Sequence, residues 1–116
     1  MITWNDFEKV EMRIGTILNV EDFPEARKPA YQITVDFGIE IGIKKSSAQI
    51  TKRYTKEELI GKQIIAVVNF PKKQIGKFMS ECLVLGSVGT ENDIVLLTSD
   101  IKVENGLRIG YKKVQN

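Results

Sequence analysis

Apolar and polar residues alternate along two early stretches of the chain, which is typical of strands that bury one face. The alternation runs through residues 12–20 and again through residues 31–37. Gly38 then predicts a turn, and residues 39–43 place isoleucine at every second position, which predicts a third strand. Gly15 interrupts the first stretch and indicates a bend or a bulge there.

The second half of the chain has shorter apolar runs. Residues 63–68 are almost wholly apolar, which predicts a strand buried on both faces. The runs at 82–85 and 94–97 predict two further strands, and 107–109 form a last short pattern. Between these elements, residues 44–54 are polar and irregular, and residues 71–77 read as a basic loop.

Two short helices are expected from their capping residues. Thr3 precedes an apolar face within residues 4–10 and has an aspartate three positions later. Thr55 and Glu58 have the spacing of a capping box, in which each side chain accepts a hydrogen bond from the other's free backbone N–H. Gly61 is expected to end this second helix.

These elements predict an all-β fold with five to seven short strands. One strand is long and bent, and a short helix falls between the third and fourth strands, which is the order of an OB-fold, a small five-stranded Greek-key barrel. A plain β-sandwich is the alternative architecture. Neither a linker nor an internal repeat is visible, so residues 1–116 are expected to form a single domain.

The residue inventory argues against most catalytic chemistry. The 116 residues include no histidine and one cysteine, Cys82, so neither a histidine-based triad nor a zinc site is expected. No phosphate-binding glycine motif is present. These features predict a binding module that uses no metal and no cofactor. A lone cysteine, a start unlike a signal peptide and the lack of a long apolar run predict a cytoplasmic protein that does not insert into membranes.

Charge is unevenly distributed, although the net charge is only +2. Residues 44–77 carry nine basic and two acidic groups, whereas residues 1–43 carry four basic and eight acidic groups. A basic middle segment is the electrostatic footprint expected of a polyanion-binding surface. A solvated lysine-rich face is the simpler reading of the same pattern.

Several blocks, in the same order, resemble the tRNA-binding domain family. They are residues 7–15 (FEKVEMRIG), 20–26, 35–38 (VDFG), 54–62, 68–70 (VNF) with the basic loop that follows, and Ser80. Within the family, residues 26–31 (ARKPAY), 46–50 (SSAQI) and 78–83 (FMSECL) resemble the CsaA branch of export-related chaperones. The last stretch departs from the Ser-Gln-Gly-Met usual in synthetase-linked members, so their tRNA-reading roles are not carried to Glu81, Cys82 or Leu83.

The resemblance implies a non-catalytic homodimer whose OB barrel is extended by terminal elements that form the dimer. For the CsaA branch it implies binding of unfolded preproteins or presequence peptides and contact with the export motor SecA. For the broader family it implies binding of structured tRNA. Both ligands remain open at this point, and one groove could serve both.

The candidate ligand-binding residues are basic, hydroxyl, amide and aromatic side chains of the two loops and of the strands between them. The basic loop would contact phosphates or steer acidic peptide segments, and its apolar residues would contact a peptide. The candidates are Arg13, Lys28, Tyr31, Lys44, Ser46, Ser47, Gln49, Asn69, Phe70, Lys72, Lys73, Lys77, Phe78, Met79 and Ser80. The dimer seam is expected among apolar residues near the two ends, namely Trp4, Phe7, Leu96, Ile109 and Tyr111.

Overall fold

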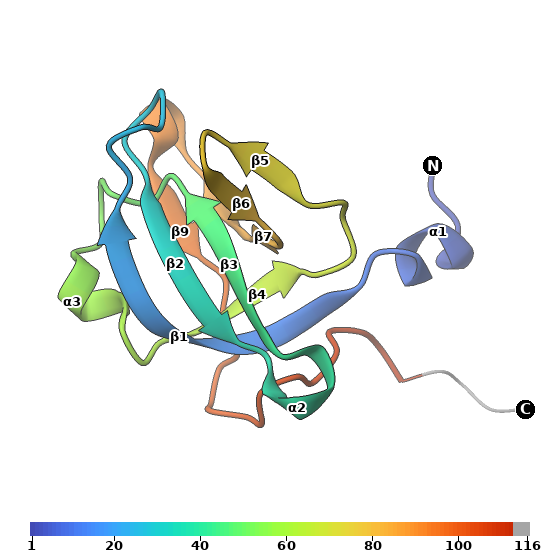
Figure 1. The fold of residues 1–116 in the computed structure, drawn as a ribbon. Coiled ribbons are helices and arrows are strands. Elements are labelled where there is room, and N and C mark those ends of the chain that lie inside the picture. Colours follow the sequence, from blue (N-terminus) through green and yellow to red (C-terminus); the bar gives the residue numbers. More distant parts are fainter. Residues whose placement is uncertain (113–116) are drawn as a thin grey trace, which may run out of the picture.

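Five antiparallel strands form one strongly curved sheet. The computed structural model describes residues 1–112, and the sheet order is β3-β2-β1-β4-β7. The strands are β1 (Met12–Asp22), β2 (Tyr31–Asp36), β3 (Ile43–Ala48), β4 (Gln63–Val67) and β7 (Leu83–Val84). β1 is the long strand that pairs with β2 along one half and with β4 along the other (Figure 1).

The two edges of this sheet, β3 and the segment leading into β7, approach each other and nearly close a barrel. The N–H of Glu81 donates to the carbonyl of Lys45 at 2.7 Å. Next to it, the buried Ser46 hydroxyl donates to the carbonyl of Cys82 at 2.8 Å. These bonds join β3 to the two residues that precede β7, so the OB-like barrel is confirmed and the sandwich alternative is wrong.

Two β-hairpins and several short helices complete the fold. The hairpins pair β5 (Lys73–Ile75) with β6 (Phe78–Ser80) and β8 (Gly86–Val88) with β9 (Ile94–Leu96). The helices are α1 (Trp4–Glu8), α2 (Gly38–Ile41) and α3 (Lys56–Leu59), and η1 (Thr90–Asn92) is a 3₁₀ turn between β8 and β9. The basic loop expected at residues 71–77 therefore contains the β5 strand.

Both predicted helix caps are present. The hydroxyl of Thr3 accepts from the N–H of Asp6, and the Asp6 carboxylate accepts from the N–H of Thr3. Thr55 and Glu58 form the same reciprocal pair at α3, between β3 and β4. Gly61 follows α3 with a φ of +89°, a conformation that a residue with a Cβ adopts only at a cost.

The strand predicted at residues 39–43 is wrong. The chain turns at Gly38, whose φ is +86°, and forms α2 instead, with the Gly42 N–H donating to the Gly38 carbonyl at 2.7 Å. The strand follows at Ile43–Ala48, inside the stretch expected to be irregular. Its inward positions hold the polar Ser46 and the small Ala48, which do not give the alternation of large apolar residues that marks a strand.

Gly15 does not form the expected bulge. It pairs regularly with Ile64 of β4, and the irregularity of β1 lies further along, between Ile17 and Asn19. A Cβ at Gly15 would lie 2.6 Å from Cγ1 of Val35 and 2.7 Å from Cδ1 of Phe37. The glycine therefore lets two buried side chains of the β2 segment pack directly on the β1 backbone.

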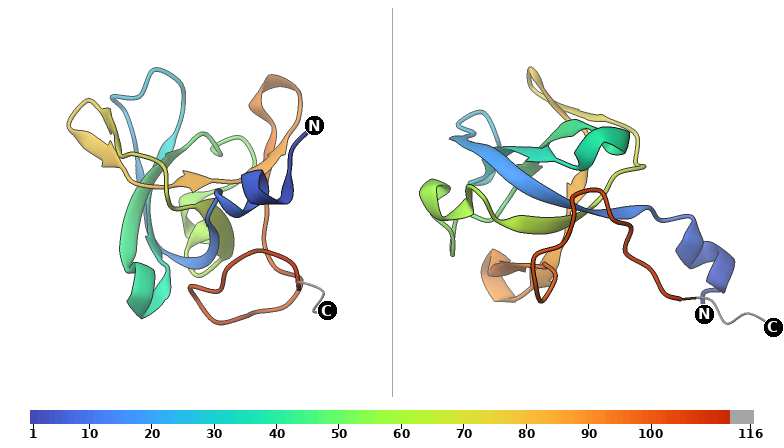
Figure 2. Two further views of the ribbon diagram at one scale, coloured as in Figure 1. Left: turned by 90° about the vertical axis from the view of Figure 1, so that its right-hand side faces the viewer. Right: turned by 90° about the horizontal axis from the view of Figure 1, so that it is seen from below.

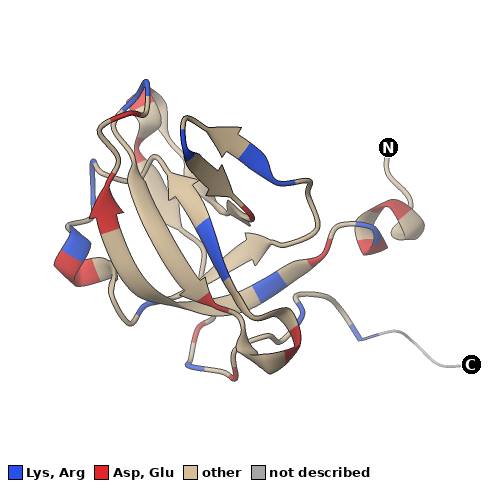
Figure 3. Cartoon of the chain, in the orientation of Figure 1, with Lys and Arg blue, Asp and Glu red and all other residues tan. Residues whose placement is uncertain are grey.

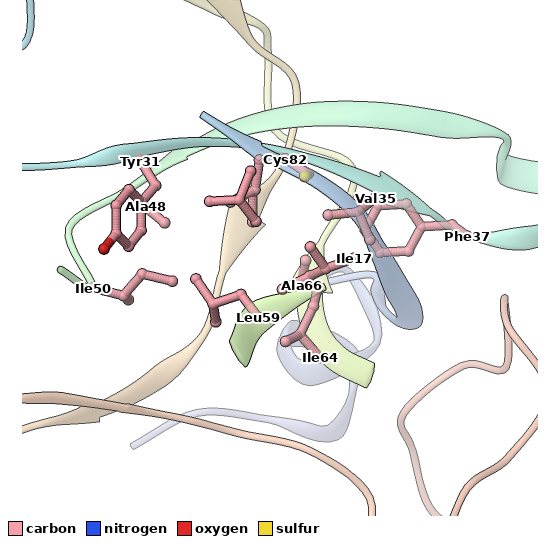
Figure 4. Close-up of a cluster of buried hydrophobic side chains, with 12 residues drawn as sticks. Ile17, Tyr31, Val35, Phe37, Ala48, Ile50, Leu59, Ile64, Ala66 and Cys82 are labelled. Carbon is pink, nitrogen blue, oxygen red and sulfur yellow. The ribbon is translucent and has the colours of Figure 1, made fainter. Parts of the chain in front are cut away.

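Apolar side chains from both halves of the sheet and from α3 fill the barrel (Figure 4). Phe37, Leu59 and Ile64 are fully buried there. Cys82 is buried among them as a small apolar side chain, as the sequence predicts, and this burial raises the pKa of its thiol to about 11. Among the described residues, no helix is long and apolar enough to cross a membrane.

The two terminal segments lie together outside the barrel, as Figure 2 shows. Residues 106–109 run along the outer part of β1, where the N–H of Ile14 donates to the Leu107 carbonyl and that of Ile109 donates to the Met12 carbonyl. Further on, the guanidinium of Arg108 donates to the Glu8 carbonyl at 2.7 Å. α1 is thus held against the C-terminal segment and contributes no buried residue to the core.

Candidate ligand-binding grooves

The β5–β6 hairpin separates two surface hollows. The first, called here the lysine groove, has a volume of about 620 Å³ and is lined by Phe70, Pro71, Lys72, Lys73, Gln74, Ser80, Cys82 and Leu83. The second, called here the aromatic groove, has a volume of about 550 Å³ and is lined by Phe23, Glu25, Gln32, Gly76, Lys77 and Phe78. The candidate residues of the basic loop are thus shared between two different surfaces.

The lysine groove combines exposed apolar side chains with basic ones. Phe70 is 56% exposed and Leu83 is 49% exposed, so both present apolar surface to solvent. Lys73 lies opposite Ser80 in the hairpin register, and Lys72 lies 3.4 Å from the carboxylate of Glu81. Side chains of this kind can bury an apolar ligand group while the ammonium groups hold a polar or anionic neighbour.

The aromatic groove lies between the hairpin and the β1–β2 loop. Phe23 is buried, and its ring centroid lies 5.1 Å from that of the half-buried Phe78. Glu25 and Lys77 give this groove one acidic and one basic side chain, and Gln32 comes from β2. The two rings support each other in the structure, so little of their surface is free for stacking a base.

A third, smaller hollow of about 340 Å³ lies between the end of β3, β7 and the β8–β9 hairpin. Ser47 and Gln49 line it from the end of β3, and Leu83 connects it with the lysine groove. Val88 of the β8–β9 hairpin lies on its other side and is 78% exposed. Two further candidates of the sequence, Ser47 and Gln49, therefore lie beside the lysine groove.

Four candidate side chains besides Arg13 make hydrogen bonds inside the chain, and one of them is Ser80, whose hydroxyl donates to the carbonyl of Cys82 at 3.4 Å. Tyr31 is buried, and its hydroxyl donates to the carbonyl of Tyr54 at 2.8 Å. Ser46 is buried in the barrel seam. Asn69 joins α1 to β4 by accepting from the N–H of Glu11 at 3.0 Å and donating to the carbonyl of Lys9 at 2.7 Å.

Arg13 also contacts the protein rather than open solvent. Its guanidinium donates to the Gly106 carbonyl at 2.8 Å and lies 3.3 Å from the Glu11 carboxylate and 3.6 Å from that of Glu40. Its buried Nε has no hydrogen-bond partner among the described residues. The side chain therefore fastens the C-terminal segment to β1, on a part of the surface that lines none of the three hollows.

The structure does not bring the remaining candidates, Met79, Lys44 and Lys28, into the lining of the three hollows. Met79 is 41% exposed on β6, opposite Gln74 of β5. Lys44 lies on β3 opposite Val35 and is half-buried, whereas Lys28 is exposed in the β1–β2 loop. Figure 3 shows basic positions on both β3 and β5.

Some basic residues of the 44–77 segment form ion pairs and others do not. Arg53 pairs with Asp93, Lys56 pairs with Asp22, and Lys72 pairs with Glu81. The other basic residues of the segment have no ion-pair partner within residues 1–112; they are Lys44, Lys45, Lys52, Lys62, Lys73 and Lys77. The unpaired cations of the hairpin itself are therefore Lys73 and Lys77.

The expected dimer residues separate into two groups. The ring centroid of Tyr111 lies 5.2 Å from that of Trp4 and 6.0 Å from that of Phe7, and the three rings line a hollow of about 680 Å³. Trp4 is 74% exposed, although it is a large apolar side chain. Leu96 instead packs against the core, and Ile109 is half-buried in the C-terminal segment that runs along β1.

Sequence reasoning missed several residues that line the grooves. Leu83 lines the lysine groove and Phe23 lines the aromatic groove, and neither is among the sequence candidates. An aromatic residue in a proline-containing loop was the available signal for Phe23. Within the described part of the chain, no group of three or more His, Cys, Asp or Glu residues could hold a metal ion.

The structure is an OB-like barrel with a basic hairpin beside its hydrogen-bonded seam. The family described as "Putative tRNA binding domain" matches residues 12–108. The chain belongs to this family.

Within the family, the chain is similar along most of its length to two solved CsaA structures. It is 52% identical to chaperone CsaA of Bacillus anthracis strain Ames, with a TM-score of 0.90 over 95% of this chain and 99% of that one. It is 56% identical to the CsaA chaperone protein of Picrophilus torridus, with a TM-score of 0.88 over 95% and 100% of the two chains. The resemblance to the CsaA branch is thereby confirmed.

The chain also matches a part of much longer enzymes. It is 32% identical over 108 residues to the methionine–tRNA ligase of Thermococcus onnurineus, which covers 93% of this chain and 14% of that protein. The match to Pyrococcus horikoshii methionine–tRNA ligase, at 33% identity, has the same extent. The chain thus spans about one seventh of the length of the ligases it matches.

Proposed function

We propose that this protein is a CsaA-like chaperone, a non-catalytic cytoplasmic homodimer that binds unfolded preproteins or presequence peptides. The observation that carries the proposal is the 52% and 56% identity to two CsaA chaperones over 95% of the chain. Contact with the export motor SecA belongs to the same proposal. The chain's match to only a small part of the ligases gives no support for a catalytic role.

The lysine groove is the proposed peptide site. Phe70 and Leu83 offer exposed apolar surface, which an apolar peptide side chain would cover with a gain of about 25 cal/mol per Å². Gln74 and Ser80 can hydrogen-bond a peptide backbone, and Lys73 can hold an acidic group near the apolar segment. Met79, exposed on the neighbouring strand β6, has a flexible side chain that suits a chaperone that must accept many sequences.

The exposed aromatic cluster at the ends is the proposed dimer seam. Trp4, Phe7 and Tyr111 surround an apolar hollow that a second copy of the chain would cover. Two lysine grooves on one dimer would bind a long unfolded chain with higher avidity than a short peptide. The dimer therefore gives a physical reason for a preference for unfolded proteins over isolated peptides.

The second candidate function is binding of structured tRNA. The family match over residues 12–108 favours it, as do the unpaired lysines Lys73 and Lys77 on the two sides of the hairpin. Each phosphate contact would release counterions, so tRNA affinity would fall steeply with salt. Apolar peptide binding would depend much less on salt.

A competition experiment separates the two functions. A labelled presequence-like peptide is bound to the purified protein and challenged with unlabelled tRNA over a range of salt concentrations. Peptide binding that persists at high salt and resists tRNA supports the chaperone function. Tight tRNA binding without a peptide signal refutes it and favours the RNA module, and mutual displacement indicates one shared groove.

A further inference from the structure

One acidic side chain, Glu81, is fixed beside the lysine groove. Its carboxylate accepts a hydrogen bond from the N–H of Lys45 at 3.0 Å, and its other oxygen lies 3.4 Å from the ammonium of Lys72. Its own N–H donates to the carbonyl of Lys45. In sequence it stands between Ser80 and Cys82, which both line the groove. The Glu81 carboxylate is therefore held by the backbone of β3 through one oxygen and by Lys72 through the other.

The carboxylate is charged at neutral pH. Partial burial acts to raise the pKa of Glu81, but the Lys45 N–H and the Lys72 ammonium outweigh it, so the pKa lies below its ordinary value. The Glu81 side chain is 24% exposed and that of Lys72 is 62% exposed. An incoming ligand can thus reach the ammonium from solvent, but only in competition with the carboxylate.

We propose that Glu81 is a specificity-determining residue that weakens polyanion binding in the lysine groove and so favours polypeptide. A phosphate that binds Lys72 must either displace Glu81 from the ammonium or share the ammonium with it. The phosphate is also repelled by the negative charge of the Glu81 carboxylate. An uncharged peptide backbone or an apolar side chain neither competes for the ammonium nor is repelled by the carboxylate. The polypeptide half of this inference rests on the proposed function, and the polyanion half stands without it.

Lys73, the neighbouring lysine of the groove, provides the internal comparison. Lys73 has no ion-pair partner among the described residues, so its ammonium is available to a phosphate at once. Lys72 becomes equally available only when the negative charge of Glu81 is removed. The two lysines should therefore contribute unequally to any tRNA binding in the natural sequence.

The first test is the Glu81→Gln variant. The glutamine amide oxygen can still accept from the Lys45 N–H, so the seam keeps its hydrogen bond while the charge is lost. We expect tRNA to bind about tenfold more tightly at low salt, with a salt dependence steeper by about one phosphate contact, while affinity for an apolar presequence-like peptide stays within about twofold. Glu57→Gln, on the exposed surface of α3, makes the same charge change away from the groove and is the matched control.

A second pair of variants keeps the test decisive if Glu81→Gln folds poorly. In the natural background, Lys73→Gln should lower the affinity for tRNA and reduce the salt slope, and Lys72→Gln should change both less. Where Glu81→Gln folds, adding Lys72→Gln should cancel most of its gain in affinity.

Three outcomes overturn the inference. They are unchanged tRNA binding by Glu81→Gln, an equal gain from Glu57→Gln, and equal losses from Lys72→Gln and Lys73→Gln. The proposed function fails separately, if the natural protein binds no peptide. A gain in tRNA affinity on Glu81→Gln would in that case still support the polyanion half.

Discussion

Replacing Gly15 with alanine tests how tightly the barrel is packed under β1. The new Cβ would lie 2.6 Å from Cγ1 of Val35 and 2.7 and 2.8 Å from two ring carbons of Phe37. Non-bonded carbons are most stable at about 3.5 to 4.0 Å, so these atoms must move by roughly 1 Å. Both side chains are fully buried, and the surrounding core leaves them little room to shift.

Overpacking of this kind costs about 1 to 3 kcal/mol. The loss of chain entropy in the unfolded state offsets about 0.4 to 1 kcal/mol of that cost. We therefore expect Gly15→Ala to lower the free energy of unfolding by about 1 to 2 kcal/mol. Urea denaturation at one fixed protein concentration measures this change, and the midpoint should fall by roughly 0.5 to 1 M with an unchanged slope.

The control is Gly110→Ala, because a Cβ at Gly110 meets no other atom within 4 Å. This variant should stay within about 0.5 kcal/mol of the natural protein. A Val35→Ala substitution removes one of the clashing groups. The double variant Gly15→Ala/Val35→Ala should therefore lose less stability than the sum of the losses in the two single variants. A Gly15→Ala protein as stable as the natural one would refute the close-packing argument.

Three further predictions concern the surface and the thiol. Replacing Lys72 and Lys73 together with glutamate should abolish tRNA binding but leave apolar peptide binding largely intact; parallel loss of both in filter-binding and fluorescence assays would contradict this. Replacing Trp4 and Tyr111 with alanine should shift the protein toward monomer in analytical ultracentrifugation and weaken capture of long chains more than of short peptides. Equal weakening of the two would argue against avidity. Because the pKa of Cys82 is raised to about 11, iodoacetamide should label the folded protein at least tenfold more slowly than the urea-unfolded protein at pH 8. Labelling at similar rates in the two states would show that the thiol is accessible and acidic.

Local patterns predicted most of the barrel. Alternating residues located β1 and β2, and in β2 the period of two matches the buried face. In β1 the register shift between Ile17 and Asn19 buries Ile17 and leaves Leu18 exposed, so the alternation located the strand but assigned these two side chains to the wrong faces. The capping pairs of Thr3 and Thr55 located α1 and α3, because their hydrogen bonds join residues only three positions apart. β3 was misplaced because its inward side holds small residues beside the seam.

The candidate site was predicted in composition more than in arrangement. The sequence identified the basic segment 71–77, including Lys72, Lys73 and Lys77, from charge alone, but as a loop and not as a hairpin. It could not tell that Lys73 and Lys77 line different grooves, since that depends on how the β5–β6 hairpin sits on the barrel. Nor could it separate Asn69, which holds α1 in place, from the exposed Phe70 beside it.

Most of the strands, the two helix caps, the basic middle segment and the family could be read from the sequence. These properties depend on residues that are close together in the sequence, so their spacing and charge are visible without knowing the fold. Which lysines have a carboxylate partner depends on the folded structure. The pair of Lys72 with Glu81 joins residues nine positions apart and forms only when the β5–β6 hairpin folds. The hydrogen bond from Lys45 to Glu81 joins residues 36 positions apart and forms only when the barrel closes and brings β3 against the segment that precedes β7.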